Sequence, residues 1–273
     1  MSAIWWVLAV LGALVLGALA YGWFEAGWVR TRIVEVPIAD LPLELDGLRI
    51  AHLSDFHLGM IGRGRVATER AVAWTVARRP DLVCITGDLV SHPRGEKLLR
   101  ELLATLGRPY VVLGNHDVAV TRDPFSRAAE LDDLRGAVLL RDDAVVVDIR
   151  GTQFQIVGVD PIQYLEGTAN PARHVDPTAS FRLLLCHFPR LARFLPARSF
   201  HLVLAGHHHA GQIVVPYPGG RLALAHPRAR ELAGLFQRPV GPTHVSAGLG
   251  TSLVPFRFFA RPEANELVLR SAE

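Results

Sequence analysis

Hydrophobic and polar positions divide the chain into an apolar N-terminal stretch and a longer region of alternating short elements. Residues 4–24 contain no charged side chain, and the first one after them is Glu25. A helix over these 21 residues spans about 31 Å, the thickness of the hydrocarbon core of a bilayer. Trp and Tyr side chains lie near both ends, where amphipathic rings favour the headgroup region. The pattern predicts an uncleaved membrane-spanning anchor over residues 1–29.

A cleaved signal peptide is the alternative interpretation of this stretch. The Ala-Leu-Ala segment at 18–20 resembles a cleavage site, but no Lys or Arg precedes the apolar residues, where signal peptides carry positive charge. For an anchor, Arg30 and Arg32 are the nearest positive charges. The positive-inside rule then predicts a single-pass protein of the cell inner membrane, with its folded domain in the cytoplasm.

Beyond the anchor, residues 30–46 contain Pro37 and Pro42 and are expected to form a connecting segment. Short apolar runs then alternate with segments whose apolar residues have helical spacing. This β-α-β-α-β order is typical of parallel strands joined by right-handed crossovers. The expected strands are 48–53, 82–86 and 110–113, and the expected helices are 66–79 and 96–106.

The second half of the chain shows mainly strand patterns. Residues 144–149 and 153–159 flank an Arg-Gly-Thr turn, which predicts a β-hairpin. The Pro- and Arg-rich stretch 216–242 is expected to form surface loops. We therefore predict one domain over residues 47–273, with two stacked sheets flanked by helices. Further strands are expected at 181–186, 201–205, 212–215, 243–247 and 266–270.

Composition and charge exclude several classes of protein. Half of the 273 residues are hydrophobic and a fifth are charged, which argues against a disordered chain. A net charge of +3 does not indicate a nucleic-acid partner. The two cysteines lie far apart in apolar runs, as buried free thiols do, and cannot form a disulfide scaffold. The unusual feature is the 12 histidines, several of which cluster in short motifs.

Residues that bind metals follow several of the predicted strands. In an open α/β sheet, ligands gather at the carboxyl ends of strands, so these side chains are expected to converge on one site. Asp55 and His57 are two residues apart, and on an extended chain they would face the same side. The candidate ligands are Asp55, His57, Asp88, Asn115, His187, His207 and His209.

Carboxylates, imidazoles and an amide oxygen together favour divalent Mn, Fe, Zn or Co. These ligands are too many for one tetrahedral zinc, whereas two ions that share a carboxylate would use them all. Two metals about 3.5–4 Å apart activate a bridging hydroxide and stabilise an in-line displacement at phosphorus. Each motif alone is more typical of a turn or a core histidine, but five of them at strand ends predict a dinuclear site.

The motifs SDFHLG, TGDLV, LGNHD, LLCHFP and GHHHAGQ together resemble the calcineurin-like metallophosphoesterase superfamily, over essentially residues 48–270. The resemblance implies an α/β fold, a four-layer α/β/β/α sandwich of two mixed sheets. It also implies that His116 binds no metal and acts near the leaving-group oxygen, as general acid or electrostatic stabiliser. The implied ligands are Asp55, His57 and His209 for one metal, Asn115, His187 and His207 for the other, and Asp88 as the bridge.

Two residues next to the candidate ligands have less defined roles. Asp117 either orients the loop or caps a turn, and His208 should point away from the ligands by strand alternation.

The chain also resembles the membrane-anchored, YkuE/YaeI-like bacterial branch of the superfamily, which includes enzymes that cleave UDP-2,3-diacylglucosamine in lipid A synthesis. Such proteins often carry a basic residue where this chain has Ala247. Replacement candidates for phosphate or headgroup recognition are Arg221, Arg228, Arg230 and Arg257.

The resemblance implies a dinuclear, metal-dependent hydrolase of phosphodiester or pyrophosphate bonds. Its partner would be a phosphoester or pyrophosphate substrate, lipid-linked in the first hypothesis and soluble in the second. A non-catalytic metal-binding scaffold is the third, and the complete ligand set argues against it. Phe256, Phe258 and Phe259 either contact acyl chains or belong to the core. Because no catalytic candidate precedes Asp55, removal of residues 1–28 is expected to leave an active domain.

Overall fold

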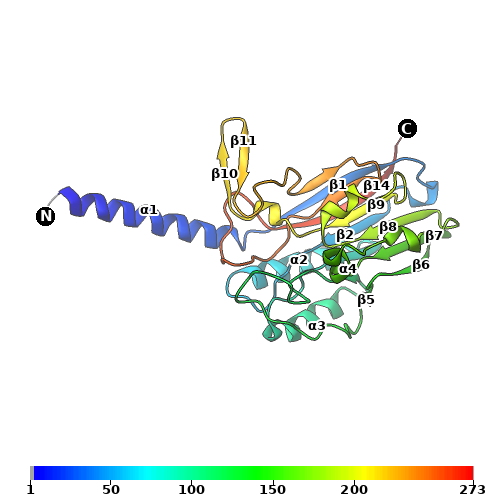
Figure 1. Ribbon diagram of the computed structural model, residues 1–273, viewed down its shortest axis with the longest axis horizontal. Helices are drawn as coiled ribbons and strands as arrows, with labels where there is room; N and C mark the ends of the chain where they lie inside the picture. The colour runs from blue at the N-terminus through cyan, green and yellow to red at the C-terminus, as the bar shows by residue number, and fades with distance from the viewer. Residues whose placement is uncertain (1–2, 273) are drawn as a thin grey trace.

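The computed structural model describes residues 3–272, as an α-helix that projects from an α/β body (Figure 1). The helix, α1 (Ala3–Glu25), is long and apolar enough to cross a membrane, and its apolar window is not buried against the body. The body contains two six-stranded sheets, each with parallel and antiparallel neighbours. The predicted pair of mixed sheets is therefore confirmed.

The first sheet has the order β1-β14-β2-β3-β4-β5, and the second has the order β12-β13-β9-β8-β7-β6. The first comprises β1 (Arg30–Ile38), β2 (Arg49–Leu53), β3 (Leu82–Thr86), β4 (Tyr110–Val112), β5 (Val138–Leu139) and β14 (Glu263–Ser271). The second comprises β6 (Asp143–Ile149), β7 (Thr152–Gly158), β8 (Phe181–Leu185), β9 (Leu202–Ala205), β12 (Gly234–Phe236) and β13 (Thr243–Val245). The helices of the body are α2 (Gly64–Arg78), α3 (Glu96–Thr105) and α4 (Pro161–Glu166).

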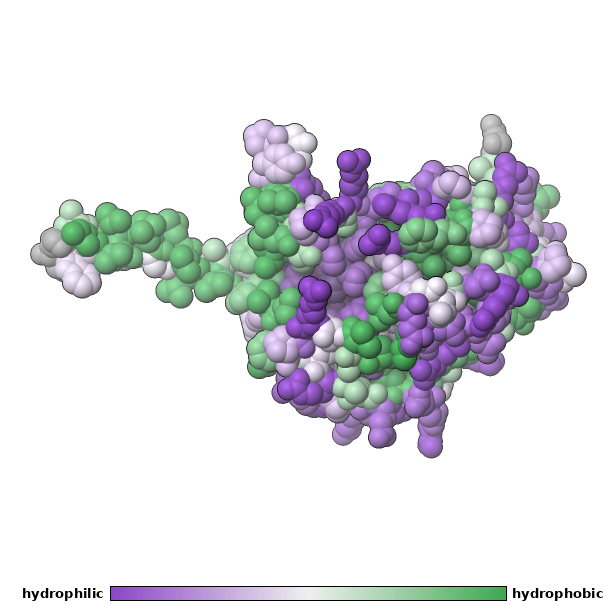
Figure 2. Space-filling view, in the orientation of Figure 1, coloured by the Kyte–Doolittle hydropathy of each residue, from purple (hydrophilic) through white to green (hydrophobic). Residues whose placement is uncertain are grey.

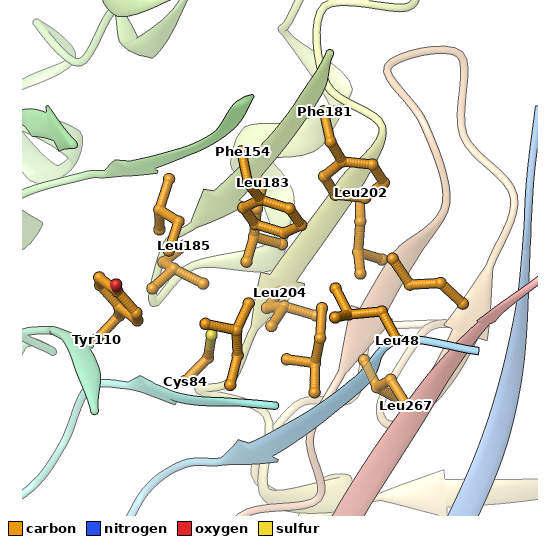
Figure 3. Close-up of a cluster of buried hydrophobic side chains, with 14 of the residues drawn as sticks. Leu48, Cys84, Tyr110, Phe154, Phe181, Leu183, Leu185, Leu202, Leu204 and Leu267 are labelled. Atoms are coloured by element: carbon orange, nitrogen blue, oxygen red, sulfur yellow. The ribbon is translucent and has the colours of Figure 1, made fainter. Parts of the chain in front are cut away.

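Three apolar clusters hold the layers together. The inner faces of the two sheets enclose the main core, where Phe154 and Phe181 stack with ring centroids 4.6 Å apart (Figure 3). On the outer face of the first sheet, α2 and α3 pack against residues such as Ile85 and Val111. The outer face of the second sheet is covered by shorter segments, among them α4 and a 3-10 turn at 189–193. These layers have the expected α/β/β/α order.

The structure corrects the expectation of a connecting segment over residues 30–46. Arg30–Ile38 forms β1, which pairs in parallel with β14 at the edge of the first sheet. Val34, Val36 and Ile38 alternate toward the main core, and this period of two is visible in the sequence. Pro37 had argued against a strand, but an edge strand tolerates proline because one side of it carries no ladder.

The stretch 216–242 is also more ordered than expected. β10 (Val214–Tyr217) and β11 (Gly220–Ala223) form a separate hairpin, and β12 joins the second sheet. Gly219 has a φ of 87° in the hairpin turn. It follows Pro218, and tight turns favour a Pro-Gly pair. The strand expected at 266–270 is the longer β14, inserted between β1 and β2.

The end of α1 is joined to the body through buried polar contacts. The Glu25 side chain is fully buried and accepts hydrogen bonds from the backbone N–H groups of Ala260 (2.6 Å) and Phe259 (3.1 Å). The backbone N–H of Arg257 donates to the backbone carbonyl of Gly22, 3.0 Å away. The last turn of α1 is thus part of the folded body. That removal of residues 1–28 leaves an active domain stays a prediction.

We expect deletion of residues 1–28 to destabilise the body measurably. Two buried N–H groups lose their acceptor, and each such loss costs about 1–3 kcal/mol of unfolding free energy. Deletion of residues 1–20 keeps Gly22 and Glu25 and serves as the matched control. The measurement is thermal unfolding of the two truncated proteins in the same detergent. Equal melting temperatures would show that the Glu25 contacts contribute nothing.

Candidate metal centre

The predicted site residues converge at the carboxyl ends of strands from both sheets. Asp55 and His57 follow β2, Asp88 follows β3, and Asn115 and His116 follow β4 in the first sheet. The second sheet supplies His187 after β8, and His207 and His209 after β9. The site therefore lies where one end of each sheet meets the other.

One group of side chains surrounds a point between the two sheets. Single ligand atoms of Asp55, His57, Asp88 and His209 all lie within 4.8 Å of one another. The Nε2 atoms of His57 and His209 are 3.0 Å apart, and His209 Nε2 is 3.3 Å from Asp55 Oδ1. Ring nitrogens and carboxylate oxygens that face one another at this spacing can hold a divalent cation.

A second group shares Asp88 with the first. His187 Nε2 lies 3.2 Å from Asp88 Oδ2 and 3.2 Å from His207 Nδ1, and the three residues form a second set that can bind a metal. Asn115 lies between Gly114 and His116, which both approach Asp88, and its buried Oδ1 has no hydrogen-bond partner among residues 3–272. A buried oxygen acceptor without a partner is costly, and a cation at this position would satisfy it. The donor set therefore fits a pair of divalent ions.

The backbone reaches this geometry through left-handed turns, not through strand alternation. Asp55 (φ 55°), His57 (φ 47°) and Asp88 (φ 52°) all have positive φ values, as do His207 and His209. The extended conformation assumed for Asp55 and His57 is therefore wrong, although both side chains face the same point. Such conformations cost about 1–3 kcal/mol each and gather at functional sites, where surrounding contacts maintain them.

Two motif glycines are required by close approach to the carboxylates. A Cβ at Gly114 would lie 2.1 Å from Asp88 Oδ1, and one at Gly206 would lie 2.5 Å from Asp55 Oδ2. No side chain fits at these distances. The glycines of the GNHD and GHHH segments thus allow the loops after β4 and β9 to pack against the two candidate metal-binding carboxylates.

Residues outside the predicted set orient the histidines. The Thr86 carbonyl accepts a hydrogen bond from His187 Nδ1 (2.8 Å), which leaves the Nε2 lone pair free for a metal. Ser91 Oγ lies 2.7 Å from His57 Nδ1 and 3.2 Å from His116 Nδ1. The sequence analysis did not identify Ser91, because a serine three residues after Asp88 is unremarkable until the fold places it between two imidazoles.

His116 lies beside the two ligand groups and belongs to neither. The His116 ring packs edge-on against the His57 ring at a centroid distance of 4.6 Å. The backbone N–H of His116 donates to Asp88 Oδ1 (2.9 Å). The Asp117 carboxylate accepts from the N–H groups of Val90 and Gly114 and so holds the loop. His208 also lies outside both groups, with its Nδ1 2.9 Å from the carbonyl of Glu231.

Comparison with known proteins identifies the family. A model of the calcineurin-like phosphoesterase family matches residues 48–211. This chain belongs to the calcineurin-like phosphoesterase family. It is accordingly a metal-dependent phosphoester hydrolase, and the predicted superfamily and branch are confirmed.

Several relatives of this phosphoesterase match it over most of their length. It is 28% identical over 228 residues to the Bacillus subtilis "Uncharacterized metallophosphoesterase YkoQ", covering 79% of this chain and 81% of that protein. It is 27% identical to the Escherichia coli "Phosphodiesterase YaeI", covering 81% and 82% of the two chains. It is 26% identical to the Chlamydia muridarum "UDP-2,3-diacylglucosamine pyrophosphatase LpxG", covering 80% and 82%.

The buried histidines of the phosphoesterase differ in the direction in which their pKa values are shifted. Burial alone would lower the pKa of His187, but the Asp88 carboxylate raises it to about 9. Burial would raise the pKa of Asp88, but the positive charge of His187 holds it well below its usual range. Burial lowers the pKa of His57 to about 3 and that of His209 well below its usual range. The metal-free protein thus keeps a proton on His187 and neutral rings at His57 and His209.

We therefore expect Mn²⁺ binding to release a proton from His187. The ring nitrogen can bind a cation only after its proton leaves, and below about pH 9 that proton is present. Apparent affinity should rise about tenfold per pH unit between neutral pH and the His187 pKa, as for the release of one proton. Calorimetric titration of the metal-free protein in buffers of different protonation enthalpy measures this release. Binding without proton release in that range would contradict the His187–Asp88 assignment.

An arginine-lined cavity of about 770 Å³ opens beside His207. Its aromatic wall contains Tyr164 and Phe188, whose rings stack 4.2 Å apart. Figure 2 shows a recess with a hydrophilic lining beside the β10–β11 hairpin. Glu231 pairs with two of the lining arginines, which leaves an excess of positive charge. The cationic residues of the wall are Arg190, Arg193, Arg228, Arg230 and Arg238.

The structure separates the four arginines that the sequence suggested for phosphate recognition. Arg228 and Arg230 line the cavity. Arg221 donates to the carbonyl of Phe259. Arg257 is fully buried and donates to the carbonyls of Gly250 and Ala247, so its guanidinium is committed to the interior, 3.3 Å from His209 Nδ1. Arg257 therefore contacts the candidate ligand His209 from the interior of the body.

Proposed function

We propose that this phosphoesterase hydrolyses a phosphodiester or pyrophosphate bond at a dinuclear metal centre, in a lipid-linked substrate such as UDP-2,3-diacylglucosamine. The observation that carries the proposal is the sharing of Asp88 by two ligand groups. The buried Oδ1 of Asn115, which has no hydrogen-bond partner within the described part of the chain, supports it. A single-metal site would leave one of these groups without a cation.

In this proposal Asp55, His57 and His209 would hold one ion, Asn115, His187 and His207 would hold the other, and Asp88 would serve both. Two divalent ions so placed would stabilise negative charge on the phosphoryl oxygens and supply a water of lowered pKa. Mn, Fe, Zn and Co all fit this donor set. Thr86, Ser91 and Arg257 keep the imidazoles in the required orientation through the contacts described above.

His116 is the proposed proton donor to the leaving group. The Ser91 hydroxyl lies at its Nδ1 and the Thr121 hydroxyl at its Nε2 (3.1 Å), so both ring nitrogens are fixed in direction. The hydrogen bond from its backbone N–H to Asp88 keeps the imidazole at the edge of the two ligand groups, of which it is not a member. A substrate oxygen that displaces Thr121 would meet Nε2 directly, which is the position required of a general acid.

The arginine-lined cavity supports a substrate with a second anionic group next to the scissile one. A pyrophosphate, or a phosphodiester with a further phosphate, would place that group among Arg190, Arg228 and Arg230. Tyr164 and Phe188 offer a flat apolar wall suited to a base or sugar ring. A simple aryl diester needs none of these contacts, so the cavity favours a substrate with a second anionic group.

The test compares substrates with the full-length protein in detergent after addition of Mn²⁺. We expect hydrolysis of a bis-aryl phosphodiester and of UDP-2,3-diacylglucosamine, and weaker hydrolysis of an aryl monoester. Arg230→Gln should raise the KM for the UDP-lipid about tenfold or more, since a charge-assisted hydrogen bond contributes about 1.5–3 kcal/mol. The KM for the aryl diester should not change, and Arg135→Gln, an exposed site, is the control. Failure on the UDP-lipid with retained diesterase activity would favour the soluble substrate class.

The anchor is part of the same proposal. α1 would cross the cell inner membrane once and, with Arg30 and Arg32 beyond it, leave the domain in the cytoplasm. Protease added to spheroplasts should leave the domain intact. Digestion from outside would place the domain, and its substrate, in the envelope.

A further inference from the structure

Exposed apolar side chains surround the point where α1 leaves the body. They belong to two segments, the loop before β14 and the β10–β11 hairpin, and Figure 1 shows the hairpin beside the base of α1. In Figure 2 the lower part of the hairpin and the body around the helix base are hydrophobic. We call this surface the apolar collar, and it consists of Val215, Leu222, Leu224, Leu253, Val254 and Phe259, each at least 40% exposed.

Hydrogen bonds join the two segments of the collar into one unit. The Val214 N–H donates to the Phe258 carbonyl (2.9 Å), and Ile213 forms a parallel bridge with Phe258. From the facing strand, the Arg221 guanidinium donates to the carbonyl of Phe259. The hairpin therefore cannot move away from the loop without loss of these contacts.

The collar lies level with the last turn of α1. The Phe258 and Phe259 rings lie 6.2 and 6.1 Å from the Tyr21 ring, and the Phe256 ring lies 6.4 Å from the Trp23 ring. Tyr21 precedes Glu25 by four residues, which is about 6 Å along a helix axis. Phe259 is 52% exposed at this level, so its free face points into the zone that surrounds the helix.

Arginine side chains near the end of α1 indicate the headgroup level at the last turn of the helix. The Arg63 guanidinium lies 6.0 Å from the Phe24 ring, and the Arg261 guanidinium lies 3.7 Å from the Trp28 ring. Arginines next to Trp and Phe at the end of an apolar helix are typical of the headgroup level of a bilayer. The polar boundary thus falls near Phe24–Trp28, and the Phe259 side of the collar extends past it toward the apolar span.

We propose that the collar inserts into the boundary between headgroups and acyl chains of the bilayer that α1 crosses. The inference rests on the proposed membrane anchor and extends it, since the body itself would then contact lipid. The occupant is a bilayer and not a second protein because the collar is continuous with an apolar helix long enough to span one. An amphipathic surface beside a membrane helix buries its apolar side chains in this zone.

Insertion would fix the metal centre relative to the bilayer. The Gln212 side chain donates to the carbonyls of Ser252 (2.8 Å) and Val254 (3.1 Å) in the collar loop. Gln212 follows the turn that carries His209 and precedes the hairpin. The ligand turn and the collar therefore form one connected piece, which holds the site at a set height above lipid.

The experiment measures the depth of single spin labels in the full-length protein. Cys84 and Cys186 are buried, so an introduced cysteine is the accessible thiol for labelling. The protein carries Leu222→Cys, Phe259→Cys or Val146→Cys, in vesicles of phosphatidylcholine with a minority of phosphatidylglycerol. Val146 is 43% exposed on β6, away from α1, and is the matched aqueous control. We expect labels at 222 and 259 to collide with oxygen more than with a water-soluble nickel chelate, and label 146 to show the reverse.

A fourth label, at Leu14→Cys in α1, tests the membrane anchor separately from insertion of the collar. If label 14 is deep and labels 222 and 259 match label 146, the anchor stands and the collar proposal is overturned. If label 14 is aqueous, both are overturned. Spin–spin broadening between copies at 222 would show a protein contact there and would also overturn lipid insertion. Turnover of a bis-aryl phosphodiester by each labelled protein tests the catalytic proposal separately from these outcomes.

Discussion

Asp88→Asn is expected to remove both metal binding and turnover. Asp88 is the residue common to the two ligand groups, and its carboxylate is buried. Loss of one charged partner from a buried ionic cluster costs about 3–5 kcal/mol. That cost corresponds to a loss of metal affinity of about 10²- to 10⁴-fold. Because each ion of the pair needs this charge, hydrolysis of a bis-aryl phosphodiester should fall at least as far.

The measurement combines elemental analysis of the purified protein with turnover at several Mn²⁺ concentrations. Asp133→Asn is the matched control, since Asp133 is exposed and its ion pair among the described residues is with Arg135. Wild-type metal content and rate in Asp88→Asn would refute the dinuclear assignment. Loss of one ion with the other retained would show that Asp88 belongs to a single group.

His116→Ala is expected to lower turnover by about 10²- to 10⁴-fold, the usual contribution of a positioned proton donor. The metal content should stay unchanged, because the ring lies outside both ligand groups. The loss should shrink for substrates with an acidic aryl leaving group, which needs little protonation to depart. A rate loss that is the same for good and poor leaving groups would support electrostatic stabilisation over proton transfer.

His174→Ala provides the control for removal of an imidazole. His174 lies in a 3-10 turn beside β7 and takes part in neither ligand group. Its variant should retain the wild-type rate on every substrate. If His116→Ala instead loses half of the bound metal, His116 is a ligand and its proposed role as proton donor is wrong.

Local patterns in the sequence were sufficient to predict most of the elements of the fold. Apolar runs of four to six residues bounded by polar segments predicted β2, β3, β4, β8 and β9, since strands buried on both faces have this pattern. β1 was missed although Val34, Val36 and Ile38 alternate, because Pro37 is acceptable only at an edge. Which strand forms the edge depends on β14, more than 200 residues later in the chain.

The candidate ligands could be named from the sequence because metal chemistry restricts residue types. A carboxylate, an amide oxygen and imidazoles at strand ends are visible without coordinates. The local geometry was not, because the left-handed backbone at Asp55, His57 and Asp88 results from contacts between loops. Gly114 and Gly206 show the cause, as each lets one loop approach the carboxylate of another.

The sequence by itself determined which side chains are candidate metal ligands, the order of most strands along the chain and the apolar helix that precedes them. Only the tertiary structure decided that Asp88 is shared by the two ligand groups, that Arg257 is an internal support and that Glu25 belongs to the folded body. The physical reason is the range of the interactions. Element formation follows from neighbours a few residues apart, whereas these three features depend on contacts between sheets and loops that only packing brings together.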